Sequence, residues 1–105
     1  MTIKYDIEID NQTILANLKR LTNLVYKLLP NREEHLDWEK PLETIIEELA
    51  GMSRLFVGQQ ETYLTLIAKL EGLFTLNKEE DFLLFRRIIF ECLSLLNEIG
   101  KICQE

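Results

Sequence analysis

The first ten residues alternate between apolar and charged or polar side chains, with a period of two. The apolar positions are Ile3, Tyr5, Ile7 and Ile9. This period is typical of a β-strand, and three of these four residues are β-branched, which favours a strand further. No later segment has the pattern. We therefore expect residues 1–10 to form an extended or β-like arm that pairs with a second copy or with another protein's sheet. The alternative is a frayed tail whose alternation is accidental.

From residue 11 onward the period changes to spacings of three and four, which is typical of amphipathic α-helices. We expect helices over residues 11–29, 40–56, 61–76 and 77–103. The connections between them are short, and short connections favour antiparallel neighbours in a bundle. A chain of 105 residues is the size of one domain. The predicted fold is therefore all-α, a four-helix bundle over residues 11–105 that follows the N-terminal arm.

Proline and polar residues predict where these helices begin and end. Pro30 is expected to stop the first helix, because proline disfavours helical geometry in the residue before it. Pro41 suits the first turn of the second helix, where its missing N–H costs nothing. Asp37 can cap the same helix if it begins earlier. At the start of the fourth helix, Asn77 and Glu80 resemble a capping box.

The fourth helix is apolar around most of its circumference, so we expect it to be the central helix, packed by neighbours on several sides. With about 25 residues it would be roughly 38 Å long, longer than the second and third helices. Its overhang, with Ile99 and Ile102, is expected to expose apolar area in a monomer. We therefore predict self-association as a two-fold homodimer through this overhang and the N-terminal arm.

Two features of the sequence concern the compartment. Cys92 and Cys103 lie eleven residues apart on the predicted fourth helix, too far apart for a disulfide, which needs Cα atoms within about 7 Å. We interpret them as reduced core thiols. The start of the chain lacks the apolar stretch of a signal peptide, and the longest uncharged run, residues 11–18, is too short to span a membrane. The expected location is cytoplasmic, with no membrane partner.

One stretch, residues 33–48, carries the whole charge imbalance of the chain. It holds seven carboxylates and one cation, and the net charge of the chain is −6. Elsewhere eleven acids balance eleven bases. This acidic balance argues against a protein that binds nucleic acid directly through a basic face. A polar working surface, if there is one, is expected in this stretch.

The same stretch contains the only histidine, His35, and the only tryptophan, Trp38. His35 has acidic neighbours, but no second histidine or suitably placed cysteine completes a zinc set, so we interpret it as a solvated connector residue. Trp38 is interpreted as a hydrophobic anchor for the second helix, although its large area would serve equally well in a partner's binding site. Both residues are candidates for partner binding.

Glu43, Glu47 and Glu48 form a cluster on the second helix that has no obvious structural role. Like charges at this spacing repel each other by a few tenths of a kcal/mol. A solvated face is the simplest interpretation. The alternative is a set of hard oxygen ligands for Mg²⁺ or Mn²⁺.

The alternative agrees with a resemblance in two segments. Residues 38–42 with 47–49, and residues 79–85, resemble the two acidic helices of the MazG-type all-helical nucleotide pyrophosphohydrolases. In that family, glutamates and an aspartate on these helices hold magnesium ions against the phosphates of the substrate. The resemblance implies a divergent Mg²⁺-dependent hydrolase. The sequence departs from the family pattern at Gly51, where a third glutamate is expected, and at Lys78, where a glutamate should precede Asp81 by three residues.

The pattern as a whole predicts a small acidic, non-catalytic module that binds another protein as an adaptor, regulator or inhibitor, without a cofactor. Two alternatives stay open: the magnesium-dependent hydrolase, and an inhibitor whose carboxylates imitate phosphates to block a nucleic-acid-binding protein. The candidate partner-binding residues are His35, Trp38, Glu43, Glu47 and Glu48.

Overall fold

In a computed structural model, which describes residues 11–53 and 60–103, the chain forms four α-helices. Two short 3₁₀ turns, η1 and η2, connect the third helix to the fourth. The elements are α1 (Asn11–Glu33), α2 (Glu39–Ser53), α3 (Gln60–Gly72), η1 (Leu73–Thr75), η2 (Glu79–Asp81) and α4 (Phe82–Cys103). The expected arm, with Ile3, Tyr5, Ile7 and Ile9, lies outside the described residues, so its role in self-association stays a prediction.

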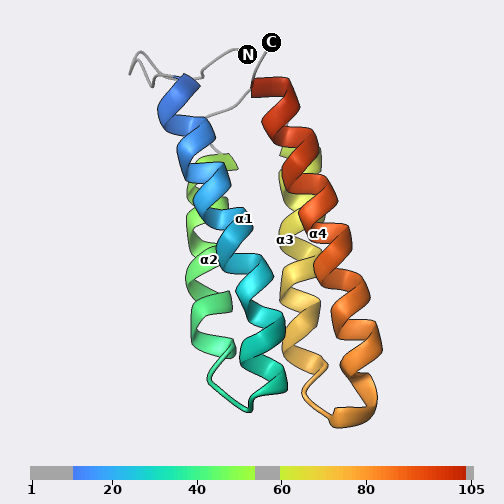
Figure 1. The fold of residues 1–105 in the computed structure, drawn as a ribbon. Helices are drawn as coiled ribbons and strands as arrows, with labels where there is room; N and C mark the ends of the chain where they lie inside the picture. The colour runs from blue at the N-terminus through green and yellow to red at the C-terminus, as the bar shows by residue number, and fades with distance from the viewer. Residues whose placement is uncertain (1–10, 54–59, 104–105) are drawn as a thin grey trace.

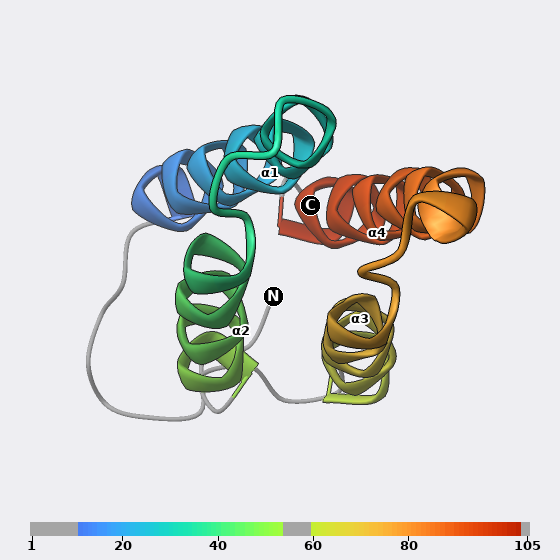
Figure 2. The ribbon, with the colours of Figure 1, turned by 90° about the horizontal axis from the view of Figure 1, so that it is seen from below.

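The helices run alternately up and down, and each packs beside the next along the chain (Figure 1). Seen along the bundle they occupy four corners, with α4 returning beside α1 and with α2 diagonally opposite α4 (Figure 2). The α1–α2 and α3–α4 connections lie at one end, which we call the connector end. This arrangement confirms the predicted all-α fold of four helices packed as a bundle. None of the described helices is long and apolar enough to cross a membrane.

The core lies between the four helices and consists of the apolar stripes that the sequence predicts. One stripe of each helix, spaced by three and four residues, faces inward. Among the most deeply buried side chains are Leu21, Val25 and Leu28 of α1, Leu42, Ile45 and Leu49 of α2, Tyr63, Leu66 and Leu70 of α3, and Phe85, Ile89 and Ile99 of α4. Burial of these side chains is the main term that holds the bundle together.

The expectation that α4 is a central helix is wrong. It occupies one corner of the bundle and packs against α1 and α3, so that its outer face is exposed (Figure 2). As expected, α4, with 22 residues, is longer than α2, with 15, and α3, with 13. The expected exposure of this extra length is not seen in the described part, because α1, with 23 residues, lies beside α4. Ile99 is consequently buried within the single chain. The side chain of Ile102 lies outside the description, and the homodimer stays a prediction.

Both cysteines lie on α4, as expected. Cys92 is fully buried in the core, and this burial raises the pKa of its thiol to about 12. The thiol is therefore protonated at neutral pH, and its role is to fill the core.

Pro30 does not end α1, and this expectation is also wrong. The helix continues past it to Glu33, although proline removes one helical hydrogen bond and crowds the preceding turn. Contacts on either side hold this last turn in place. Leu28 and Leu29, directly before the proline, are buried in the core. Arg32, two residues after it, donates hydrogen bonds to the α3–α4 connection.

The starts of α2 and α4 differ in how they are capped. Oδ1 of Asp37 accepts hydrogen bonds from the backbone N–H groups of Glu39 (3.2 Å) and Lys40 (3.3 Å), which confirms Asp37 as the cap of α2. The predicted capping box of α4 is not formed. The residue before η2 is Lys78, in extended conformation and without a side-chain cap, and this separates Asn77 from the helix.

His35 ends α1 through its backbone conformation. The N–H of Leu36 donates to the carbonyl of Asn31 (2.8 Å), and the N–H of His35 donates to the carbonyl of Arg32 (3.2 Å). This is the Schellman pattern, in which the next-to-last residue adopts the left-handed region and is usually glycine. His35 has a φ of 60°. The only histidine therefore occupies the position that reverses the chain toward α2.

Replacing His35 by glycine should raise the free energy of unfolding by about 0.5–1 kcal/mol. A Cβ in the left-handed region costs about 1–2 kcal/mol, and the greater chain entropy of glycine offsets part of the gain. Urea unfolding followed by circular dichroism measures the effect. Glu34→Gly, one residue earlier and without a positive φ, is the matched control and should lower stability. A destabilised His35→Gly protein would contradict this role.

Candidate functional site

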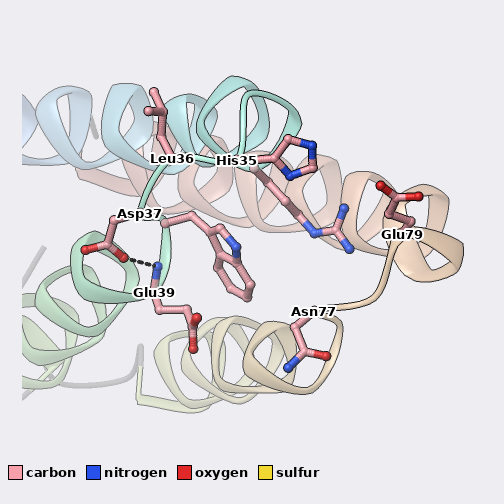
Figure 3. A pocket seen from close by; sticks show the side chains of 8 residues that line it. His35, Leu36, Asp37, Glu39, Asn77 and Glu79 are labelled. Atoms are coloured by element: carbon pink, nitrogen blue, oxygen red, sulfur yellow. Dashed lines mark hydrogen bonds between the residues drawn. The ribbon is translucent and has the colours of Figure 1, made fainter.

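A pocket of about 320 Å³ opens at the connector end, between the two connections. Residues from the α1–α2 connection line one side, and residues from the α3–α4 connection line the other (Figure 3). The lining residues are Arg32, His35, Leu36, Asp37, Trp38, Glu39, Asn77 and Glu79. It contains two of the predicted partner-binding residues.

Arg32 joins the two sides of this pocket. Its guanidinium donates through Nε (3.2 Å) and Nη2 (2.9 Å) to the carbonyl of Leu76, and through Nη2 to the carbonyl of Lys78 (2.5 Å). The same group lies over the rings of Phe82 (5.3 Å) and Phe85 (4.9 Å from the ring centroid). The donors and the cationic face of Arg32 are thus used within the chain, to hold the α3–α4 connection against the end of α1.

Trp38 lies beneath the pocket and belongs to the core. Its side chain is only 8% exposed, and its ring meets Phe85 edge to face, with centroids 5.0 Å apart and planes at 80°. This geometry is favourable for two aromatic rings. It agrees with the interpretation of Trp38 as the anchor of α2, and it leaves little indole area for a partner.

The remaining polar groups of the pocket do not form a reactive or metal-binding set. Asp37 is engaged as the cap of α2 (Figure 3), and His35 is an exposed residue at the chain reversal. Within residues 11–53 and 60–103, no group of three or more histidine, cysteine, aspartate or glutamate side chains is placed to hold a metal ion. The contact between the two connections therefore explains the shape of the pocket.

The three glutamates of α2 do not converge. Glu48 turns toward α1 and forms an ion pair with Arg20, with 2.6 Å between Oε2 and Nη2. Glu43 and Glu47 are exposed and have no ion pair with a described residue. Gly51 lies where the family resemblance requires a further carboxylate. These residues do not fit a magnesium site, and we derive no metal chemistry from them.

Sequence reasoning missed a surface on α4, which we call the α4 outer face. It is a shallow groove of about 440 Å³ lined by Leu83, Arg86, Arg87, Phe90, Glu91 and Ser94. Leu83 is 75% exposed and Phe90 is 44% exposed, and the guanidinium of Arg86 lies 5.3 Å from the centroid of the Phe90 ring. The expectation of a central α4 concealed this surface. The signal was the pair Leu83 and Phe90, seven residues apart and on the same side of the helix as both arginines.

Comparison with known proteins gives no further guide to the function: no family model matches this chain, and neither a curated protein nor a solved structure does.

Replacing Arg32 by alanine should lower the free energy of unfolding by about 2–3 kcal/mol. Hydrogen bonds from a charged donor contribute about 1.5–3 kcal/mol each, and water replaces part of what is lost at this half-exposed site. Arg20→Ala is the matched control, because it removes only an exposed ion pair with Glu48 and should cost less than about 1 kcal/mol. Both are measured by urea unfolding. Equal losses in the two variants would mean that Arg32 does not join the connections as described.

Proposed function

We propose that this chain is a non-catalytic module that binds another protein, and that it does so through the α4 outer face. The observation that carries the proposal is the exposure of Leu83 and Phe90 on the side of α4 that faces away from the core. Burial of a fully exposed side chain of this size contributes about 1.5–3 kcal/mol. Because Leu83 is 75% and Phe90 is 44% exposed, a partner would gain about three quarters of this at Leu83 and less than half at Phe90. Exposed apolar area that is grouped on one face is typical of a protein–protein interaction site.

The chemistry of this face also suits a binding site. Aromatic residues and arginine are the residue types enriched at the centres of protein interfaces. Because the guanidinium of Arg86 lies over the ring of Phe90, both side chains are partly ordered before a partner arrives. Less side-chain entropy is then lost on binding.

The placement of the most reactive side chains supports a non-catalytic role. The Cys92 thiol is buried and protonated, whereas a nucleophilic cysteine has to be accessible and ionised. His35 is exposed at the connector end, where its backbone conformation already accounts for its position.

Replacing Leu83 and Phe90 together by serine should remove the partner. The tagged double variant is purified from its native cells and analysed by quantitative mass spectrometry. Enrichment of one specific protein should fall by about tenfold, because loss of the two apolar contacts costs about 1.4 kcal/mol or more. Leu64→Ser is the matched control, since Leu64 is 62% exposed but lies on α3. An unchanged set of bound proteins, or the same loss with Leu64→Ser, would refute the proposal.

One observation favours a second candidate, the inhibitor whose carboxylates imitate phosphates. Glu39, Glu43 and Glu47 follow one another at four-residue spacing on α2, about 6 Å apart along the axis. All three are exposed and none has an ion pair with a described residue. They form a regular row of negative charge that a basic nucleic-acid-binding surface would attract.

Under this second candidate, Glu43→Gln with Glu47→Gln should release a basic partner, whereas Glu48→Gln, which affects a carboxylate already paired with Arg20, should retain it. Retention of that partner should also fall when the salt is raised from about 50 to about 300 mM, because exposed charges are screened. Retention that is insensitive to salt would exclude phosphate mimicry. The same purification measures both effects.

A further inference from the structure

We infer that the occupant of the α4 outer face is an acidic amphipathic helix of a different protein. This inference rests on the proposed function and names the chemistry of the partner segment. It comes from the order of side chains along the face and from the charges that surround them.

Four residues define the order. Leu83 and Phe90 lie at the two ends, and Arg86 and Arg87 lie between them, at the third and fourth positions after Leu83. All four are exposed. Seven residues of helix separate the two apolar side chains by about 10.5 Å along the axis. The face therefore offers two apolar contacts with a positively charged centre between them.

The positive charge of this centre is not neutralised by the described part of the chain. Neither arginine has an ion pair with a described residue. Glu91, the one acidic residue that lines the groove, is paired with Lys69 of α3, with 3.2 Å between Oε1 and Nζ. The local charge is thus positive on a molecule whose net charge is −6. An occupant that carries carboxylates opposite Arg86 and Arg87 would complete the face.

The spacing indicates that the occupant is a helix. A single exposed helix offers no free backbone edge to which an extended segment could add as a strand. A suitable partner helix has apolar residues seven apart and acidic residues at the third and fourth positions between them. It would place both apolar contacts and both carboxylates along the line of side chains on α4. This is the reciprocal of the pattern on α4.

Charge disfavours three other occupants. In a two-fold pair that sets Leu83 against Phe90 of a second copy, the centre falls between Arg86 and Arg87, so that four guanidinium groups would meet. Nucleic acid and anionic membranes are repelled at longer range by the net charge of −6. An acidic helix of another protein is short, so its carboxylates interact mainly with the arginines of the face and less with the net charge of the molecule.

Fluorescence anisotropy of a labelled synthetic helix tests the inference with the full chain. The acidic probe is a peptide of about 18 residues with leucines seven apart and glutamates between them, and the basic probe has lysine in place of each glutamate. The chain should bind the acidic probe at least about tenfold more tightly at about 50 mM salt, and the difference should shrink at about 300 mM. Arg86→Glu with Arg87→Glu should reverse the preference. Arg20→Glu on α1, the matched control, should leave it unchanged.

Equal binding of the two probes, preference for the basic one, or binding of neither would overturn the inference. So would a solution mass of twice 12.4 kDa that Phe90→Ser abolishes, because the occupant would then be a second copy. Tighter binding to vesicles with anionic lipid than to the acidic probe would overturn it in favour of a membrane. The proposed function is tested separately, by whether Leu83→Ser with Phe90→Ser, but not Leu64→Ser, removes the co-purified partner.

Discussion

The interaction on which the connector end depends is the contact of one guanidinium with two chain segments. Arg32 bonds to backbone carbonyls of the α3–α4 connection and lies over two phenylalanine rings at the start of α4. This holds the last turn of α1 in helical form beyond Pro30 and thereby fixes where the chain reverses at His35. The start of α2 follows from that reversal, and Trp38 enters the core against one of the same rings. Without Arg32, the apolar stripes would still favour four helices. The two connections would, however, lose the strongest polar contact that holds them together.

Local patterns predicted the elements of this fold well, and contacts between distant residues caused the failures. The spacing of apolar residues identified the four helices, and one apolar stripe of each helix forms the core, because burial follows directly from periodicity. The local preference of Pro30 to end a helix was overridden by buried leucines before it and by Arg32 after it. The corner position of α4 could not be read from its own sequence, since α4 is apolar on most sides and only its neighbours decide which side stays exposed.

The acidic stretch shows the same limit for the candidate site. A count of carboxylates indicates how much charge is present but not in which direction each side chain points. In the structure one of them caps α2, another pairs with Arg20, and a row of three on α2 remains in solvent. The α4 outer face, by contrast, was not predicted from the sequence, and the structure reveals it. Its residues are unremarkable in composition, and they become a coherent surface only once α4 is known to lie at a corner of the bundle.

The diagonal placement of α2 and α4 has a consequence for how the molecule meets other proteins. The exposed carboxylates of α2 and the arginines of α4 lie at opposite corners of a bundle about 20 Å across. The separation of these two charged groups contributes an electric dipole that runs across the bundle axis. The field of an approaching charged protein exerts a torque on this dipole, which favours one orientation of the bundle about its long axis before any atoms touch. Which corner leads is then decided by the sign of the approaching charge, so that a single small domain can present different faces to different neighbours.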